Sequence, residues 1–82
     1  LVDSVLGGLS EAPARERDRL LDTVRRYAAS GAVSEVAAEL YCHRNTVLNR
    51  LRRFTELTGR DVTVPTQAAA VLLALHCADR RP

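Results

Sequence analysis

The sequence predicts an all-α fold: a small bundle of about five helices that contains a helix-turn-helix. Apolar residues recur at helical spacing along most of the chain. The 82 residues include only one phenylalanine, two tyrosines and no tryptophan, so the core must consist mainly of leucine, valine and alanine. Runs of β-branched residues are absent except at residues 62–64, where Pro65 follows and excludes a central strand. A chain of this length forms one small domain.

Two helical segments are expected before the helix-turn-helix. Residues 1–6 have enough apolar positions for one or two turns, and the glycine pair that follows is expected to end them. A longer helix starts within the charged segment that comes next, with Ser10 and Asp18 as alternative N-caps. Its apolar positions are regular from Leu20 onward. Gly31 is expected to end it in the left-handed conformation.

The middle of the chain predicts the helix-turn-helix itself. A short helix is expected at residues 33–40, then a two-residue turn, then a longer helix at residues 43–58. Val47, Leu51 and Phe54 give this second helix one apolar face. Its other side carries guanidinium, amide and hydroxyl groups, which suit phosphates and base edges. A short helix, a tight turn and a polar-tipped helix are typical of DNA-binding helix-turn-helices.

A last helix is expected from Thr66 to about Ala78, with Pro65 at its first position. Residues 62–64 are expected to be extended, as the residue before a proline usually is. This helix is apolar almost all round, which predicts burial on more than one side. Its spare apolar face is expected to contact a second subunit or another part of a larger protein. Alternatively, the first helices cover it completely.

Positive charge is concentrated in the helix at residues 43–58 and just after it. The whole chain has a net charge of only +2. Localised positive charge favours a polyanionic partner, and the alternative is a solvated helix face. Between His43 and Arg60 the single acid is Glu56, and the arginines are Arg44, Arg50, Arg52, Arg53 and Arg60.

If the helix-turn-helix binds duplex DNA, the start of its second helix enters the major groove. Arg44 and Arg50 are placed on the outward face, and Arg44 is expected to read a base, preferentially guanine. Asn49 is suited to a bidentate contact with adenine. Ser34 and the first amides of the short helix are candidates for clamping a phosphate. The predicted DNA-binding residues are Ser34, His43, Arg44, Asn45, Thr46, Asn49, Arg50, Arg52 and Arg53.

Other chemistry is poorly supported. The pairs Cys42-His43 and His76-Cys77 contain the residue types of a zinc site, but adjacent ligands strain a tetrahedron and no CxxC or HxxxH spacing is present. We therefore expect no metal and no cofactor. A nucleophile with a positioned base and a phosphate-binding glycine loop are also missing, so enzyme activity is not expected. No apolar run reaches the length of a membrane span. Two cysteines without framework spacing favour a reducing, cytoplasmic setting.

Three blocks of sequence carry a family resemblance: Leu20–Val24, Ala37–Val47 with its His-Arg-Asn-Thr-Val run, and Leu51-Arg52-Arg53 with the downstream Gly59-Arg60-Asp61. They resemble the C-terminal helix-turn-helix domain of PucR-type bacterial transcriptional regulators, which include purine-catabolism and sugar-diacid regulators. The resemblance extends from about Leu6 to Leu75. The turn and helix spacing is also similar to DNA-binding domains of the factor-for-inversion-stimulation type.

The resemblance implies a cytoplasmic bacterial regulator whose effector is bound by a region absent from this chain. The chain starts without Met, which agrees with a fragment of a larger protein. Two departures from the family pattern bear on the fold. Tyr41 stands in the turn where a helix-turn-helix often has glycine, so a different turn geometry is expected. Val64 stands before the proline where many relatives have an acid, which leaves Thr63 as the expected cap of the last helix.

Two main hypotheses follow, beside a zinc-stabilised module that the ligand spacing disfavours. In the first, residues 1–82 form a single DNA-binding domain that binds an operator in double-stranded DNA sequence-specifically. The domain then works as a homodimer or higher homo-oligomer through residues 66–78, because one copy offers too small a footprint for useful specificity. In the second, the chain is a helical protein-interaction or dimerisation module that does not bind DNA.

Overall fold

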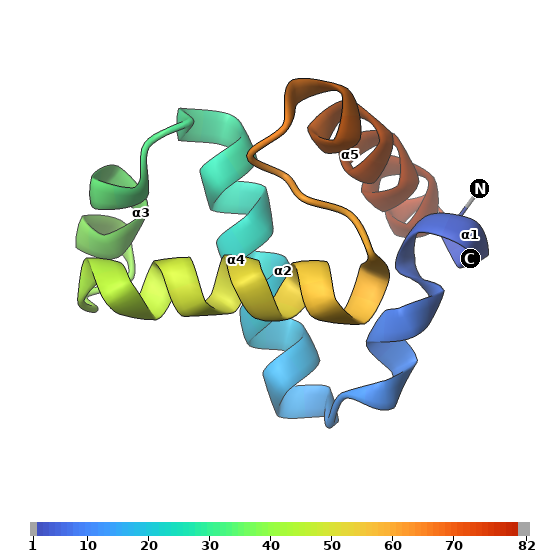
Figure 1. Ribbon diagram of the computed structural model, residues 1–82, viewed down its shortest axis with the longest axis horizontal. Helices are drawn as coiled ribbons and strands as arrows, with labels where there is room; N and C mark the ends of the chain where they lie inside the picture. The colour runs from blue at the N-terminus through green and yellow to red at the C-terminus, as the bar shows by residue number, and fades with distance from the viewer. Residues whose placement is uncertain (1, 81–82) are drawn as a thin grey trace.

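The computed structural model describes residues 2–80 and confirms the all-α prediction (Figure 1). No strand occurs among these residues. Two short elements, an α-helix and a 3₁₀-helix, come first, and four longer helices follow. The elements are α1 (Val2–Leu6), the 3₁₀-helix η1 (Gly7–Glu11), α2 (Ala14–Ser30), α3 (Val33–Glu39), α4 (Arg44–Thr58) and α5 (Pro65–Asp79).

Helices α2 and α4 cross at the centre of the molecule (Figure 1). Helix α3 packs against both of them at one end of α4, and this α3–α4 pair is the helix-turn-helix. At the other end of α4, η1 packs against it. Helix α1 lies along α5, and α5 also contacts α2. One face of α4 is therefore covered by neighbouring elements, while another is left open.

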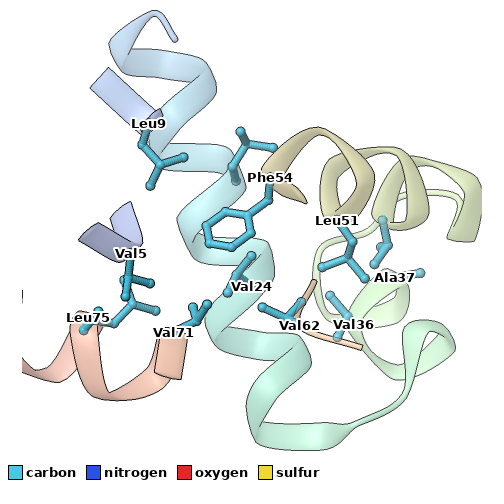
Figure 2. Close-up of a cluster of buried hydrophobic side chains, with 13 residues drawn as sticks. Val5, Leu9, Val24, Val36, Ala37, Leu51, Phe54, Val62, Val71 and Leu75 are labelled. Carbon is cyan, nitrogen blue, oxygen red and sulfur yellow. The ribbon is translucent and has the colours of Figure 1, made fainter. Parts of the chain in front are cut away.

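Phe54 of α4 lies in the middle of the core and is fully buried. Figure 2 shows its ring between Leu9 of η1 and Val24 of α2. Val71 of α5 is also completely buried in this cluster. Burying an aliphatic or aromatic side chain of this size stabilises the fold by about 1.5–3 kcal/mol. The other members of the cluster are Val5, Leu20, Val36, Ala37, Val47, Leu51, Val62, Ala74 and Leu75.

The start of α2 differs from the expectation. Neither Ser10 nor Asp18 is its N-cap, because the helix begins at Ala14 directly after Pro13. The proline has φ −56°, a value already suited to entering a helix, and its carbonyl accepts a hydrogen bond from the Arg17 N–H at 2.9 Å. The glycine pair also does not end the helical conformation. It converts α1 into the tighter 3₁₀ turns of η1, where the Ser10 hydroxyl donates to the Gly7 carbonyl.

The segment before α5 also corrects the expectation. Residues 61–64 form a turn in which the Val64 N–H donates to the Asp61 carbonyl at 3.1 Å, and Val64 itself is extended. Thr63 is not the helix cap, because its hydroxyl donates to the Asp61 carboxylate at 2.6 Å. The hydroxyl and backbone N–H of Thr63 both donate to this carboxylate and hold the pKa of Asp61 below its ordinary value of 3.8. Asp61, rather than Thr63, organises the turn.

Gly8 brings η1 into direct contact with the last turn of α4. A methyl group on its Cα would overlap the Leu57 carbonyl oxygen and lie 2.8 Å from the Leu57 carbonyl carbon. At Gly7, one residue earlier, no atom lies within 4 Å of such a group. Only the second glycine therefore sets how closely η1 approaches α4.

Replacing Gly8 with alanine is expected to lower the free energy of unfolding by about 1–3 kcal/mol, because η1 must move away from α4. Chemical denaturation of the purified variant measures this change. Gly7→Ala is the matched control and should stay within about 0.5 kcal/mol of the wild type, the usual range for an open surface position. Equal stabilities for the two variants would show that the close approach is not required.

Candidate nucleic-acid interface

The turn between α3 and α4 is a Schellman motif with a tyrosine at its left-handed position. The Cys42 N–H donates to the Ala37 carbonyl at 3.0 Å, and the Tyr41 N–H donates to the Ala38 carbonyl at 3.3 Å. Tyr41 has φ 54°, and its side chain is 97% exposed. Tyr41 was expected to alter the geometry of the turn, but it does not. The tyrosine adopts the left-handed conformation that glycine adopts more readily. This conformation costs a non-glycine residue about 1–2 kcal/mol.

His43 caps the N-terminus of α4. Its Nδ1 accepts a hydrogen bond from the Asn45 N–H at 3.0 Å. In a neutral imidazole with Nδ1 acting as acceptor, the proton lies on Nε2, which is therefore a donor. The ring is exposed, so His43 presents an N–H at the leading end of the helix. The first turn of α4 contains no acidic residue.

Helix α4 has the two faces that its sequence predicts. Val47, Leu51 and Phe54 are buried. Asn45, Asn49 and Arg52 are exposed; we call these three residues the outward strip. Arg52 Nη1 donates to Asn49 Oδ1 at 3.2 Å, so the arginine occupies one acceptor position of the amide and leaves its NH₂ group free to donate.

Arg50 does not lie on the open side where the sequence analysis placed it. It is half-buried, and its Nη1 lies 3.4 Å from the Thr23 hydroxyl of α2. Thr23 is itself fully buried and donates to the Arg19 carbonyl at 2.8 Å. The sequence contained a signal for this position. Arg50 follows Val47 by three residues and precedes Phe54 by four, which puts it beside the apolar stripe.

Arg53 is also turned toward α2. Its Nε donates to the Glu16 carboxylate at 2.7 Å, and its Nη1 lies 3.7 Å from the Glu56 carboxylate. The hydrogen bond and the negative charge of Glu16 raise the pKa of the Arg53 guanidinium above its ordinary value. A groove of about 330 Å³ runs between α2 and α4 beside this ion pair. Its lining residues are Glu16, Arg19, Leu20, Thr46, Asn49, Arg50 and Arg53.

The predicted site residues thus fall into three groups. His43, Arg44 and the outward strip are exposed along one side of α4 and its tip. Ser34 is exposed in the first turn of α3. Thr46, Arg50 and Arg53 line the groove against α2, which Asn49 of the outward strip also lines. Sequence reasoning did not identify Glu16 and Arg19 as neighbours of α4, because they lie about 30 residues away in the chain and only the crossing of the two helices brings them close.

A second exposed surface lies on α5. Leu72 and Leu73 are 43% and 53% exposed, while Val71, Ala74 and Leu75 are buried. This confirms that the helix has apolar side chains on more than the face that it buries within the domain. Its last turn is tied to α2 by two hydrogen bonds, of 2.7 and 2.8 Å, between Arg25 and Asp79. This contact lowers the pKa of Asp79.

Residues 2–80 lack the arrangements that several other kinds of site require. Neither cysteine in this part of the chain is in a disulfide. No group of three or more histidine, cysteine or acidic residues within it is arranged to hold a metal ion. None of its helices is both long and apolar enough to cross a bilayer.

The comparisons with known proteins agree with the helix-turn-helix formed by α3 and α4. Residues 20–77 match the model of the PucR C-terminal helix-turn-helix domain. The chain is 38% identical over 75 residues, 90% of its length, to the purine catabolism regulatory protein of Bacillus subtilis. It is 41% identical over 56 residues, 67% of its length, to uncharacterized proteins of Mycobacterium tuberculosis and Mycobacterium bovis. The matched segment spans 14% of each of these relatives.

No solved structure gives a significant match to the chain. The family assignment therefore rests on the sequence comparisons, and the match covers both helices of the helix-turn-helix, residues 20–30 of α2 and nearly all of α5. The chain belongs to the PucR C-terminal helix-turn-helix family.

Proposed function

We propose that this domain binds double-stranded DNA sequence-specifically, with the N-terminal half of α4 in the major groove. The observation that carries the proposal is the pair of opposite faces on α4. The core holds one face rigidly, and the outward strip projects hydrogen-bonding groups from the other. An α-helix fits the width of the major groove, and a first turn without acids suits an approach to phosphates.

Roles for the individual side chains follow from their positions. Arg44 is exposed in the first turn of α4, and we assign it to a guanine. Asn49 lies one turn beyond Asn45 on the outward strip, and its hydrogen bond from Arg52 orients its amide toward a base. Arg52, Arg53 and Ser34 are assigned to backbone phosphates, which position the helix without reading sequence. Thr46 and Arg50 support the helix from the groove side.

The wider role that we propose is that of a bacterial transcriptional regulator working in the cytoplasm. The support is the family itself and the regulatory name of the Bacillus subtilis relative. Because the chain matches only 14% of that relative, an effector-binding region would lie in the remainder of such a protein. We assign the domain no cofactor and a regulatory rather than an enzymatic role.

Replacing Arg44 with alanine is expected to weaken binding to the cognate site by about 1–3 kcal/mol and to relax the preference at one base position. Selection of bound sequences from a random duplex pool identifies that site, and fluorescence anisotropy then measures the affinity. Arg80→Ala removes the same charge at the end of α5 and is the matched control.

Arg52→Ala should differ from Arg44→Ala by weakening binding to all sequences alike.

If each copy neutralises three to four phosphates, the logarithm of the binding constant should fall against the logarithm of salt concentration with a slope of roughly −3 to −4. A flat salt dependence, or an Arg44→Ala variant with wild-type preference, would contradict the proposal. Either result would favour the alternative module that does not bind DNA.

His43 allows capping and DNA contact to be separated. Asparagine at position 43 retains an N-cap acceptor but loses the exposed Nε2–H, so His43→Asn should fold with wild-type stability and bind the cognate duplex more weakly. His43→Ala should lose both properties, with a stability cost of about 1 kcal/mol for the missing cap. Thermal unfolding and anisotropy measure the two effects. Unchanged affinity in the asparagine variant would restrict His43 to the capping role.

We further propose that two copies associate through the exposed apolar side chains of α5. Leu72 and Leu73 on that helix are the observation that favours it. Sedimentation should show a dimer whose population increases with concentration, and Leu73→Glu should shift the protein to the monomer. Tyr41→Ser, which also removes an exposed apolar side chain, is the control and should leave the dimer intact. A wild-type chain that stays monomeric at every concentration would refute association through α5.

A further inference from the structure

The ion pair between Arg53 and Glu16 joins the DNA-facing helix to the helix that supports it. The two residues are 37 positions apart in sequence, and Glu16 Oε1 lies 2.7 Å from Arg53 Nε. Glu56 lies 3.7 Å from another nitrogen of the same guanidinium. Two carboxylates thus flank one arginine, which lies on the side of α4 that faces α2. Arg44 and Arg52 have no ion pair among the described residues.

The charge of the groove depends on Glu16. Three arginines and one acid line it, so its formal charge is 3 − 1 = +2, and neutralising Glu16 would raise it to +3. Arg50 has one nitrogen directed at Thr23, while Arg19 is exposed at the rim. Glu16 is therefore the acid that offsets a local concentration of positive charge beside the outward strip.

We propose that Glu16 competes with DNA phosphate for Arg53 and thereby limits the affinity of α4 for duplex DNA of any sequence. This inference rests on the proposed DNA-binding function. A carboxylate and a phosphate present the same kind of paired oxygen acceptors to a guanidinium, so one replaces the other with little change in geometry. When Arg53 contacts a phosphate, the Glu16 bond is lost or shared, and the net gain from that contact is reduced.

The Arg53–Glu16 ion pair is exposed enough for Arg53 to exchange Glu16 for a phosphate, so the pair is not a permanent anchor between the two helices. The side chains of Arg53 and Glu16 are 45% and 37% exposed, so water and an incoming phosphate reach both of them. Exposed ion pairs contribute little to folding. Contacts to the phosphate backbone of DNA supply nearly all of the sequence-independent affinity. An acid that weakens one such contact lowers non-specific binding, while base contacts made by Arg44 or Asn49 are unaffected.

The test measures the affinity of the Glu16→Gln variant for a short duplex of random sequence. Fluorescence anisotropy gives the binding constant at each point of a salt series from about 50 to 200 mM. The variant should bind about twofold to fivefold more tightly than the wild type at the low-salt end, the range expected from releasing one exposed ion pair. Its salt slope should become steeper by at most about 0.9, the increment for one phosphate that Arg53 neutralises without competition from Glu16. Glu11→Gln, which removes an exposed acid of η1, is the control for a general change of charge.

A double-mutant cycle separates competition for Arg53 from general repulsion of DNA. In the Arg53→Gln background, Glu16→Gln should no longer change the affinity or the slope. A gain that persists without Arg53, no gain at all, or weaker binding by Glu16→Gln would overturn the inference while leaving DNA binding intact. If the wild type does not bind duplex DNA, the proposed function fails, and this inference fails with it. Circular dichroism melting verifies that each variant is folded.

Discussion

Packing of the apolar face of α4 against α2 is the interaction on which the rest of this domain depends. Phe54 and Val47 are fully buried at this crossing, together with Val24 from α2. A one-residue rotation of α4 would move these side chains out of the core by about 100°, at a cost of about 1.5–3 kcal/mol for each exposed side chain. The core therefore fixes which residues of α4 face outward, and the chemistry of the open face follows from the packing of the buried one.

Local geometry at the turn completes this orientation. Tyr41 reverses the chain in a left-handed conformation, and His43 then satisfies an amide at the start of α4. Both features limit where the helix begins. They also place the polar side chains of its first turn at an exposed end of the helix. The strain at Tyr41 is not offset by packing, because its side chain is almost entirely exposed. Favourable burial elsewhere in the core must therefore stabilise the turn.

The sequence was sufficient for the helices and for the core face of α4, because periodic apolar positions report directly on burial. It was insufficient where a single hydrogen bond decided the outcome. Asp61, rather than Thr63, organises the turn before α5, and Pro13 starts α2 in place of the polar caps at Ser10 and Asp18. The close approach of η1 to α4 at Gly8 could not be predicted either, since a glycine in the sequence does not reveal which backbone lies beside it.

The arginines of α4 show why composition alone gives an incomplete account of a charged helix. Arg50 is directed at a buried threonine, Arg53 is held by an acid from α2, and Arg44 and Arg52 remain exposed. All four carry the same charge, yet the energy available to an incoming anion differs for each, because a guanidinium that already has a partner gains less from a new one. Helix α2 thus supplies core residues from one side and, through Thr23 and Glu16, engages two of these four arginines.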